Sequence, residues 1–222
     1  MSKGIIGVPT GNASRWSVFY SCLTRLQTPL ETGINIQRGN SVSENRNEII
    51  REALRTGAQW IFFLDDDLQF ERDILLKLLS RNLDAVVGLS LQRKVPFAPL
   101  AYKSQDGSGK ATQLNLTPDM KGLIEIDSST AGGLLVKRKV FEKMKDPWFL
   151  SGQVSEAGED FYFCMKLREA GFKLHLDTDT MLGHITEFTI LPKKTSEGWR
   201  TQLIQSLPFV EIPPSGAETW KK

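Results

Sequence analysis

Three consecutive aspartates, Asp65, Asp66 and Asp67, directly follow the apolar segment 60–64. Like charges a few ångströms apart repel, and at an effective dielectric constant of about 20 each pair costs roughly 2–4 kcal/mol. A divalent cation would remove this repulsion. Because side chains alternate along an extended chain, Asp65 and Asp67 should point to one side and Asp66 to the other. Two carboxylates on one side suit Mg²⁺ or Mn²⁺, with open positions for phosphate oxygens. The alternative is a solvated turn in which Asp66 or Asp67 caps the next helix.

The chain has only two histidines, His175 and His184. His175 lies in the sequence LHL, which is typical of a half-buried strand. His184 follows a glycine at the end of the last apolar segment. An Asp-x-Asp ion site lacks a third ligand, and imidazole tolerates Mn²⁺, so His184 is a candidate metal ligand. Taken alone, a histidine in this position is more often structural than a metal ligand.

Two adjacent acids, Glu159 and Asp160, open a helix-forming segment. Acids favour the first helical turn because they interact well with the helix dipole, which also keeps them ionised. An ionised carboxylate at the edge of a cleft can accept a proton from an attacking hydroxyl group. The spacing is compatible with either role.

The composition excludes several classes of protein. The 222 residues are 40% hydrophobic and have a formal net charge of +2. This predicts one compact domain and no dedicated nucleic-acid clamp. The two cysteines, Cys22 and Cys164, are in no CxxC spacing, which argues against a zinc site and for a reducing compartment. No segment is apolar enough for a secretion signal or a membrane span, so we expect a soluble, cytoplasmic protein.

The first 90 residues alternate buried strands with amphipathic helices. Strands are expected at 4–8, 33–37, 60–64 and 84–89, and helices at 15–26, from a cap at Ser43 to Gly57, and around 74–79. This order predicts a mostly parallel sheet with helices on both faces. The Pro9-Thr10-Gly11 turn and the acidic turn both follow strand ends, where ligands bind in open α/β sheets.

The second half has shorter elements. Strands are expected at 98–102, 113–116, 123–126, 134–136, 173–176 and 181–185, and helices at 140–145 and 159–170. The prolines and tryptophans after Pro192 predict an irregular C-terminal arm over 192–222.

Six segments together resemble the GT-A glycosyltransferases, especially the family 2-like group related to cellulose, chitin and wall-polymer synthases. In chain order they are IIGVPTGN at 5–12, SENRNEIIREAL at 43–54, WIFFLDDDLQF at 60–70, TAGGLLVKRKVF at 130–141, GEDFYFCMKLREAGFKL at 158–174 and GHI at 183–185. The resemblance implies an α/β fold of the Rossmann-like GT-A class with a mixed, mostly parallel sheet. It also implies a catalytic domain over 1–191, with a nucleotide-binding half (1–91) and an acceptor half (92–191).

The resemblance assigns the donor side of a site. Pro9 and Thr10 match the loop that touches the nucleobase, and Arg46 matches an arginine that faces the nucleotide. In isolation, Arg46 would be interpreted as an exposed helix residue paired with a glutamate. The acidic turn matches the DxD motif: Asp65 lies near the ribose and the ion, Asp66 adds to the donor site, and Asp67 binds the ion directly. His184 completes the metal ligands Asp65, Asp67 and His184.

The acceptor side is assigned in the same way. Gly132 and Gly133 match small residues that let the backbone approach the donor sugar, although a tight turn would also use them. Asp160 matches the catalytic base, and Glu159 helps to hold the acceptor. Trp148, with Phe149, lies just before that helix and is a candidate to stack on the acceptor, whereas a core position is the alternative.

The implied activity is metal-dependent transfer of a sugar, as a hexosyltransferase, from a nucleoside-diphosphate sugar (a UDP-sugar first) to a hydroxyl acceptor. The cofactor would be Mn²⁺ or Mg²⁺. Attack assisted by Asp160 predicts inversion, but a metal-binding histidine also occurs in retaining GT-A families, so both outcomes stay open. The chain lacks the membrane helices and the Q-x-x-R-W signature of the processive synthases.

Compact members of this kind are frequent in phage genomes, where some resemble enzymes that glucosylate hydroxymethylated DNA bases. The acceptor is therefore a glycan or such a base, and a viral chain would act in the host cytoplasm. The arm over 192–222 either closes the cleft or pairs two subunits as a homodimer.

Two other functions compete with sugar transfer. A sugar-nucleotide nucleotidyltransferase also uses paired acids on an α/β sheet, but it should carry a glycine-rich phosphate loop, which GVPTGNASR matches poorly. A non-catalytic binding module with a degenerate GT-A fold would use basic residues as a rim for an anionic partner. These basic residues are Arg93, Lys94, Lys137, Arg138, Lys139, Lys193 and Lys194.

Overall fold

The computed structural model describes residues 3–11, 17–94, 96–104, 111–117, 119–152, 158–196, 198–205 and 210–211. The elements of the first half are β1 (Gly4–Thr10), α1 (Ser17–Thr24), β2 (Thr32–Arg38), α2 (Val42–Thr56), β3 (Trp60–Phe63), β4 (Leu68–Phe70), α3 (Ile74–Ser80) and β5 (Ala85–Leu89). Those of the second half are β6 (Ala101–Ser104), β7 (Ala111–Gln113), β8 (Leu123–Ile126), β9 (Ser128–Ser129), β10 (Leu134–Lys137), α4 (Arg138–Met144), α5 (Glu159–Glu169), β11 (Leu174–His184), β12 (Phe188–Thr195), β13 (Gly198–Gln205) and β14 (Val210–Glu211). Within these ranges no helix has the length and apolar character needed to cross a membrane.

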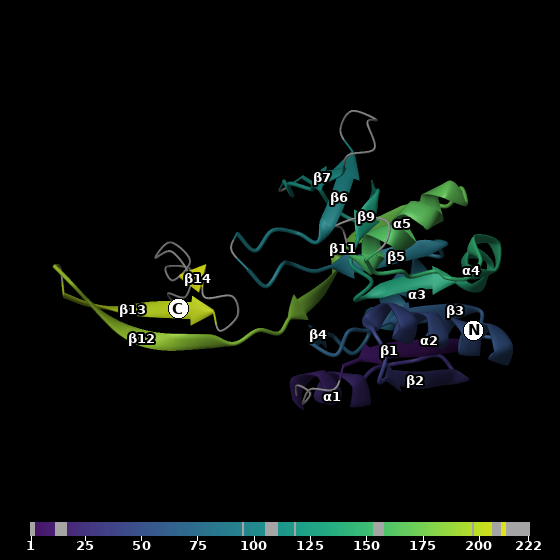
Figure 1. Ribbon diagram of the computed structural model, residues 1–222, viewed down its shortest axis with the longest axis horizontal. Coiled ribbons are helices and arrows are strands. Elements are labelled where there is room, and N and C mark those ends of the chain that lie inside the picture. Colours follow the sequence, from purple (N-terminus) through teal and green to yellow (C-terminus); the bar gives the residue numbers. More distant parts are fainter. Residues whose placement is uncertain are drawn as a thin grey trace.

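The central sheet has eight strands in the order β2-β1-β3-β10-β5-β11-β4, with β8 paired to β11. Strands β1, β2, β3, β5 and β11 run in one direction, and β10, β4 and β8 run against them. The sheet is therefore mixed and mostly parallel in strand direction, as expected from the βα alternation. A small sheet, β7-β6-β9, lies beside it (Figure 1).

Alternate residues of the buried strands belong to two hydrophobic clusters, one on each face of the sheet. Ile61 and Phe63 of β3 belong to one cluster, and Trp60 and Phe62 to the other. The first cluster packs against α2, α4 and α5, and the second against α1 and α3. A strand buried on both faces is apolar at every position, which explains why 60–64 is an unbroken apolar segment.

Helix α2 begins and ends as its sequence demands, with one change. The N-cap is Ser41, whose Oγ accepts from the Glu44 backbone N–H at 3.3 Å, and the predicted cap Ser43 lies inside the helix. Gly57 ends the helix with φ 78°, in the left-handed region that glycine adopts without strain. The predicted helix over 15–26 is confirmed from Ser17 to Thr24, and its first residues lie outside the described part.

Strand β11 brings His184 to the acidic turn. Two segments were expected, at 173–176 and 181–185, but they form one strand with an irregularity between Asp177 and Met181. The first part pairs with β5, and the last residues pair with β4, where His184 lies opposite Leu68. Strand β4, which the sequence analysis missed, is thus the element that aligns His184 with Asp67.

The segment after β11 is not irregular over its described residues, contrary to the prediction. Strands β12 and β13 form an antiparallel hairpin with eight paired positions, from Phe188↔Gln205 to Thr195↔Gly198. The predicted boundary at 191/192 falls inside β12. The hairpin extends away from the central sheet at the left of Figure 1. The rest of the predicted arm, 206–209 and 212–222, lies outside the described residues.

A buried amide ties α2 to the segment before α5. The Asn47 Oδ1 accepts from the backbone N–H of Trp148 (3.2 Å) and Phe149 (3.0 Å), and its Nδ2 donates to the Phe149 carbonyl (2.8 Å). Asn47→Ala leaves these backbone groups buried and unpaired, and each unpaired group costs about 1–3 kcal/mol. We expect urea denaturation to show a loss of about 3 kcal/mol or more. The exposed control Asn40→Ala should change the stability by less than about 0.5 kcal/mol; equal effects would contradict this role of Asn47.

Candidate active site at the carboxyl ends of β1 and β3

Asp67 and His184 meet at one corner of the acidic turn. The His184 Nε2 lies 3.4 Å from Asp67 Oδ2, and the Ile185 N–H donates to the Asp67 carbonyl at 2.8 Å. The guanidinium NH1 of Arg93 lies 2.8 Å from the same Oδ2. The other carboxylate oxygen, Oδ1, is buried and has no hydrogen-bond partner among the described residues. Such an oxygen is an available ligand for a cation.

The His184 ring is oriented in the way typical of a metal ligand. Its Nδ1 lies 3.0 Å from the Leu91 carbonyl oxygen, which can only accept, so Nδ1 carries a proton. In the neutral ring, Nε2 then presents a lone pair toward the Asp67 carboxylate. Metal-binding histidines usually donate their other ring N–H to a backbone carbonyl or a carboxylate in this way. Asp67 and His184 therefore fit a Mn²⁺ or Mg²⁺ ion chemically.

The charges of this corner shift both pKa values. Burial would raise the pKa of Asp67, but the hydrogen bond and charge of His184, together with Arg93, hold it below its ordinary value. Burial would lower the pKa of His184, but Asp67 and the Leu91 carbonyl raise it overall. Each group thus stabilises the charged form of the other.

Asp65 does not join this corner as a third ligand. Both of its oxygens accept from Arg46 NH2, at 2.8 and 3.1 Å. Within the described part of the chain, no three His, Cys, Asp or Glu side chains are grouped to hold an ion. The structure therefore does not bring the predicted ligands Asp65, Asp67 and His184 together as one group, and only Asp67 and His184 adjoin. The physical reason is the buried guanidinium, which turns the first acid away from the third.

Arg46 is buried between the carboxylates of Asp65, Glu159 and Asp160. Its side chain is only 2% exposed, and its NH1 contacts both Glu159 and Asp160, the latter at 2.9 Å. The guanidinium also lies over the Phe149 ring, 5.3 Å from the centroid. Burial opposes the charge of Arg46, but Asp65, Asp160 and Glu159 together raise its pKa. Arg46 is thus not the exposed helix residue of the alternative interpretation, and its contact with a nucleotide stays a prediction.

The protonation of Asp160 is strongly altered by its surroundings. Burial, with smaller contributions from Glu159 and Asp65, raises the pKa of Asp160 to about 7, although Arg46 opposes the shift. The side chain is 22% exposed, so one side of the carboxyl group reaches solvent. A carboxylate with a pKa near neutrality can both take and release a proton at physiological pH. The structure places Asp160 where a general base could act.

Thr10 and Asp66 form the edge of the site on the β1 side. The Thr10 hydroxyl donates to Asp66 Oδ2 at 2.5 Å, and Asn45 Nδ2 donates to the Thr10 carbonyl at 3.2 Å. Asp65 and Asp66 thus point to different partners, as the alternation predicted. Pro9 and Thr10 were expected in a turn, but they are buried at the end of β1. Their contact with a nucleobase stays a prediction.

Gly132 and Gly133 leave room for side chains of the site. A Cβ on Gly132 would lie 2.8 Å from Asp65 Oδ2. Gly133 has φ 84°, and a Cβ there would lie 2.9 Å from the Leu182 side chain. The absence of these side chains therefore lets Asp65 and Leu182 pack closely. Approach of the backbone to a donor sugar stays a prediction.

Trp148 does not face the cleft. It is 4% exposed, and its indole Nε1 donates to the Phe141 carbonyl at 2.9 Å inside the core. Phe149 is fully buried and stacks on Phe163, with centroids 4.7 Å apart. Of the two positions considered for Trp148, the structure shows the core one, and a ring so nearly buried offers little surface for stacking on an acceptor. Glu159, predicted to hold the acceptor, pairs with Arg46.

Arg93 is the site residue that the sequence analysis assigned differently. It was grouped with Lys94 as a basic rim, but its guanidinium contacts Asp67. Its loop is closed by the Leu91↔Pro99 bridge, and the Leu91 carbonyl orients His184. The sequence contained one feature that could have indicated this role of Arg93, a positively charged residue shortly after a strand end. Charged loops commonly have such residues, so the feature is not specific.

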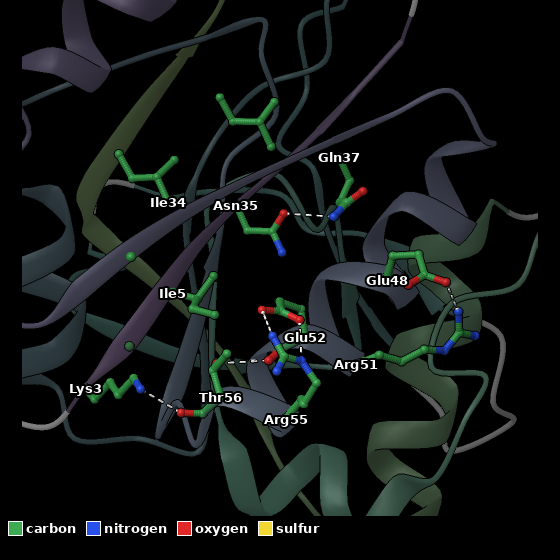
Figure 2. A pocket seen from close by; sticks show the side chains of 13 residues that line it. Lys3, Ile5, Ile34, Asn35, Gln37, Glu48, Arg51, Glu52, Arg55 and Thr56 are labelled. Carbon is green, nitrogen blue, oxygen red and sulfur yellow. Dashed lines mark hydrogen bonds and ion pairs between the residues drawn. The ribbon is translucent and has the colours of Figure 1, made fainter.

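A pocket of about 690 Å³ lies elsewhere, between β2 and α2 (Figure 2). It is lined by the first residues of β1 and the last turns of α2, so it lies toward the amino end of β1. Its two arginines are paired with acids, Arg55 with Glu52 at 2.7 Å and Arg51 with Glu48 at 2.6 Å. Ligands of open α/β sheets bind at the opposite, carboxyl edge. The acidic corner is therefore the better candidate.

No protein-family model matches the chain, and no curated protein matches it. Among solved structures it is similar to A197 from STIV, with a TM-score of 0.58 and 16% identity over 95% of this chain and 98% of that chain. GalNAc-T7, crystallised with UDP, GalNAc and Mn²⁺, gives a TM-score of 0.59 and 16% identity over 83% of this chain. S. aureus TarS 1–349 in complex with UDP-GlcNAc gives 0.51 and 12% over 84%.

This chain spans 44% of the GalNAc-T7 chain and 59% of the TarS 1–349 chain. GalNAc-T7 and TarS are GT-A glycosyltransferases, so the predicted GT-A fold class is confirmed. At these identities the similarity concerns the fold.

Proposed function

We propose that the protein transfers a sugar from a nucleoside-diphosphate sugar, such as a UDP-sugar, to a hydroxyl acceptor. Asp67 and His184 would hold a divalent ion, and Asp160 would act as the general base. The observation that carries this proposal is the Asp67 corner, where an oriented imidazole faces a carboxylate whose buried Oδ1 has no partner in the described part of the chain. The GT-A fold and the binding of UDP by two similar proteins support the same assignment.

The donor side is divided between two acids. Asp67 and His184 would bind the ion, and Thr10 with Asp66 would contact the nucleoside at the end of β1. When bound, the ion would neutralise the negative charge that develops on the leaving diphosphate. Asp65, fixed by Arg46, would add negative potential behind the ion without entering its ligand set.

Asp160 would take the proton of the acceptor hydroxyl as its oxygen attacks the anomeric carbon. Arg46 holds the base in place, since it pairs with Asp160 and with Asp65 through its two terminal nitrogens. The base and the metal corner are thus tied to one buried cation. Attack on the face opposite the leaving group would give inversion, which proton NMR of the early product can test against retention.

Calorimetry tests the donor assignment. The protein should bind UDP in the presence of Mn²⁺ and lose most of that affinity in EDTA. Incubation with Mn²⁺ and a panel of nucleotide sugars should then release UDP from one of them by slow hydrolysis. Release of pyrophosphate from UTP and a sugar phosphate would instead indicate a nucleotidyltransferase. Absence of any metal-dependent nucleotide binding would support a non-catalytic module.

The rate should depend on pH through Asp160. A base works only when ionised, and the raised pKa of Asp160, about 7, means that the ionised fraction falls as pH drops below neutrality. We expect the turnover number to fall about tenfold per pH unit below this pKa and to be constant above it. Binding of Mn²⁺ and UDP measured over the same pH range separates this effect from protonation of His184. A rate that stays constant from pH 8 to 5 would contradict the role of Asp160.

The proposed acceptor group is a hydroxyl of a glycan or of a hydroxymethylated DNA base. Glucosylated product from DNA that contains hydroxymethylated bases, but not from unmodified DNA, would select the second class.

A further inference from the structure

Arg93 occupies the oxygen of Asp67 that faces His184. Its NH1 lies 2.8 Å from Asp67 Oδ2, and His184 Nε2 lies 3.4 Å from the same atom. The Arg93 side chain is 50% exposed, whereas the Asp67 side chain is 18% exposed. Asp67 is thus the fixed partner of this ion pair, and Arg93 reaches it from the solvent side.

The loop that carries Arg93 is anchored at its base. Leu91 pairs with Pro99, and the Gln92 N–H donates to the Ala98 carbonyl at 2.9 Å. The Leu91 carbonyl accepts from His184 Nδ1 at 3.0 Å. The same loop therefore orients one proposed metal ligand and places a cation on the other.

A divalent ion held by the Asp67 carboxylate and His184 Nε2 would lie close to this guanidinium, and two cations so close repel each other. Arg93 can move away from Asp67, because its side chain is half exposed and a released guanidinium group is solvated again. Guanidinium groups bind phosphate oxygens through two parallel hydrogen bonds. A diphosphate held at this corner would provide such oxygens within reach of the displaced side chain.

We propose that Arg93 is an internal counter-ion of Asp67 that gives way when a divalent ion binds and then contacts the diphosphate of the nucleotide. This inference rests on the proposed function. It predicts opposite effects of removing Arg93 on two affinities. The affinity for Mn²⁺ should rise, because Arg93 no longer competes for Asp67. The affinity for UDP should fall, because a contact with the phosphates is lost. A residue that only supported the fold would not produce this change of sign.

The test compares Arg93→Gln with Lys94→Gln, the next cation on the same loop, which removes the same charge. Binding of Mn²⁺ alone is measured by calorimetry and by electron paramagnetic resonance. We expect Arg93→Gln to bind Mn²⁺ about fivefold more tightly than the wild type, the scale of an exposed ion pair. At saturating Mn²⁺ its affinity for UDP should fall about tenfold or more, as for loss of a charged hydrogen bond. Lys94→Gln should change neither affinity by more than about twofold.

Inorganic pyrophosphate identifies the group that Arg93 contacts. In the presence of Mn²⁺, the affinity of Arg93→Gln for pyrophosphate should fall below that of the wild type by the same factor as its affinity for UDP. A loss with UDP but not with pyrophosphate would overturn the diphosphate contact. Equal behaviour of the two variants, in a wild type that binds both Mn²⁺ and UDP, would overturn the Arg93 proposal alone. A wild type that binds neither would overturn both this inference and the proposed function.

Discussion

Asp160→Asn should lower turnover about 10³-fold while leaving the Mn²⁺-dependent affinity for UDP within about twofold of the wild type. Asparagine keeps the size of the side chain and can still contact Arg46, but it cannot accept the proton of an attacking hydroxyl. The pH dependence below neutrality should disappear together with the rate, because the group that titrates has been removed. Steady-state kinetics with the donor sugar identified by the panel, and calorimetry with UDP, measure the two quantities.

Glu159→Gln is the matched control for this substitution. Glu159 and Asp160 both contact Arg46 NH1 and adjoin each other at the start of α5. If the carboxylates serve only to neutralise Arg46, the two variants should be impaired to the same degree. If Asp160 is the base, Glu159→Gln should retain a pH-dependent rate far above that of Asp160→Asn. Full activity of Asp160→Asn would show that the base lies elsewhere.

Asp67→Ala should remove metal-dependent nucleotide binding and lower turnover about 10³-fold. Its carboxylate is half of the proposed ligand pair, and a bound metal ion stabilises a transition state by several kcal/mol, which corresponds to about three powers of ten in rate. His184→Ala should act in the same direction, because it removes the other ligand. Both effects are measured by calorimetry with Mn²⁺ and UDP and by kinetics at increasing Mn²⁺.

The control is Asp84→Ala, which removes an acid that pairs with Lys139 (2.8 Å) just before β5 begins, away from the acidic corner. It changes the net charge of the protein equally but should preserve binding and rate. Thermal denaturation of all three variants checks that each is folded. Retention of Mn²⁺-dependent UDP binding by Asp67→Ala would exclude the metal corner described here.

Hydrophobic periodicity determined the architecture from the sequence. The unbroken apolar segment 60–64 predicted a strand buried on both faces, and β3 feeds both hydrophobic clusters. Gly57 predicted the end of α2, because only a residue free to adopt the left-handed conformation closes a helix in this way. These features depend on neighbouring residues, so a local pattern is enough to predict them.

The charged contacts were beyond the reach of a local pattern. Arg46 pairs with Asp65, 19 residues away, and with Glu159 and Asp160, 113 and 114 residues away. A sequence shows that these residues are charged, but the choice of partner depends on which strand ends and helix starts meet in space. Arg46 pairs with Asp65 and not with Asp67, so Asp67 meets His184 and Arg93 instead.

The tertiary structure also decided which side chains are buried, where the sequence allowed either a core position or a position facing the cleft. Trp148 precedes a helix at the cleft and could have faced a substrate, but Asn47 hydrogen-bonds its backbone and the core encloses its ring. His184 reaches Asp67 because β4 pairs with the end of β11, a contact of three residue pairs that no periodicity predicts. The sequence by itself thus determined the sheet, the helices and the acids at a strand end. Only the packing of distant elements decided which acid pairs with the buried Arg46 and which lies beside His184 and Arg93.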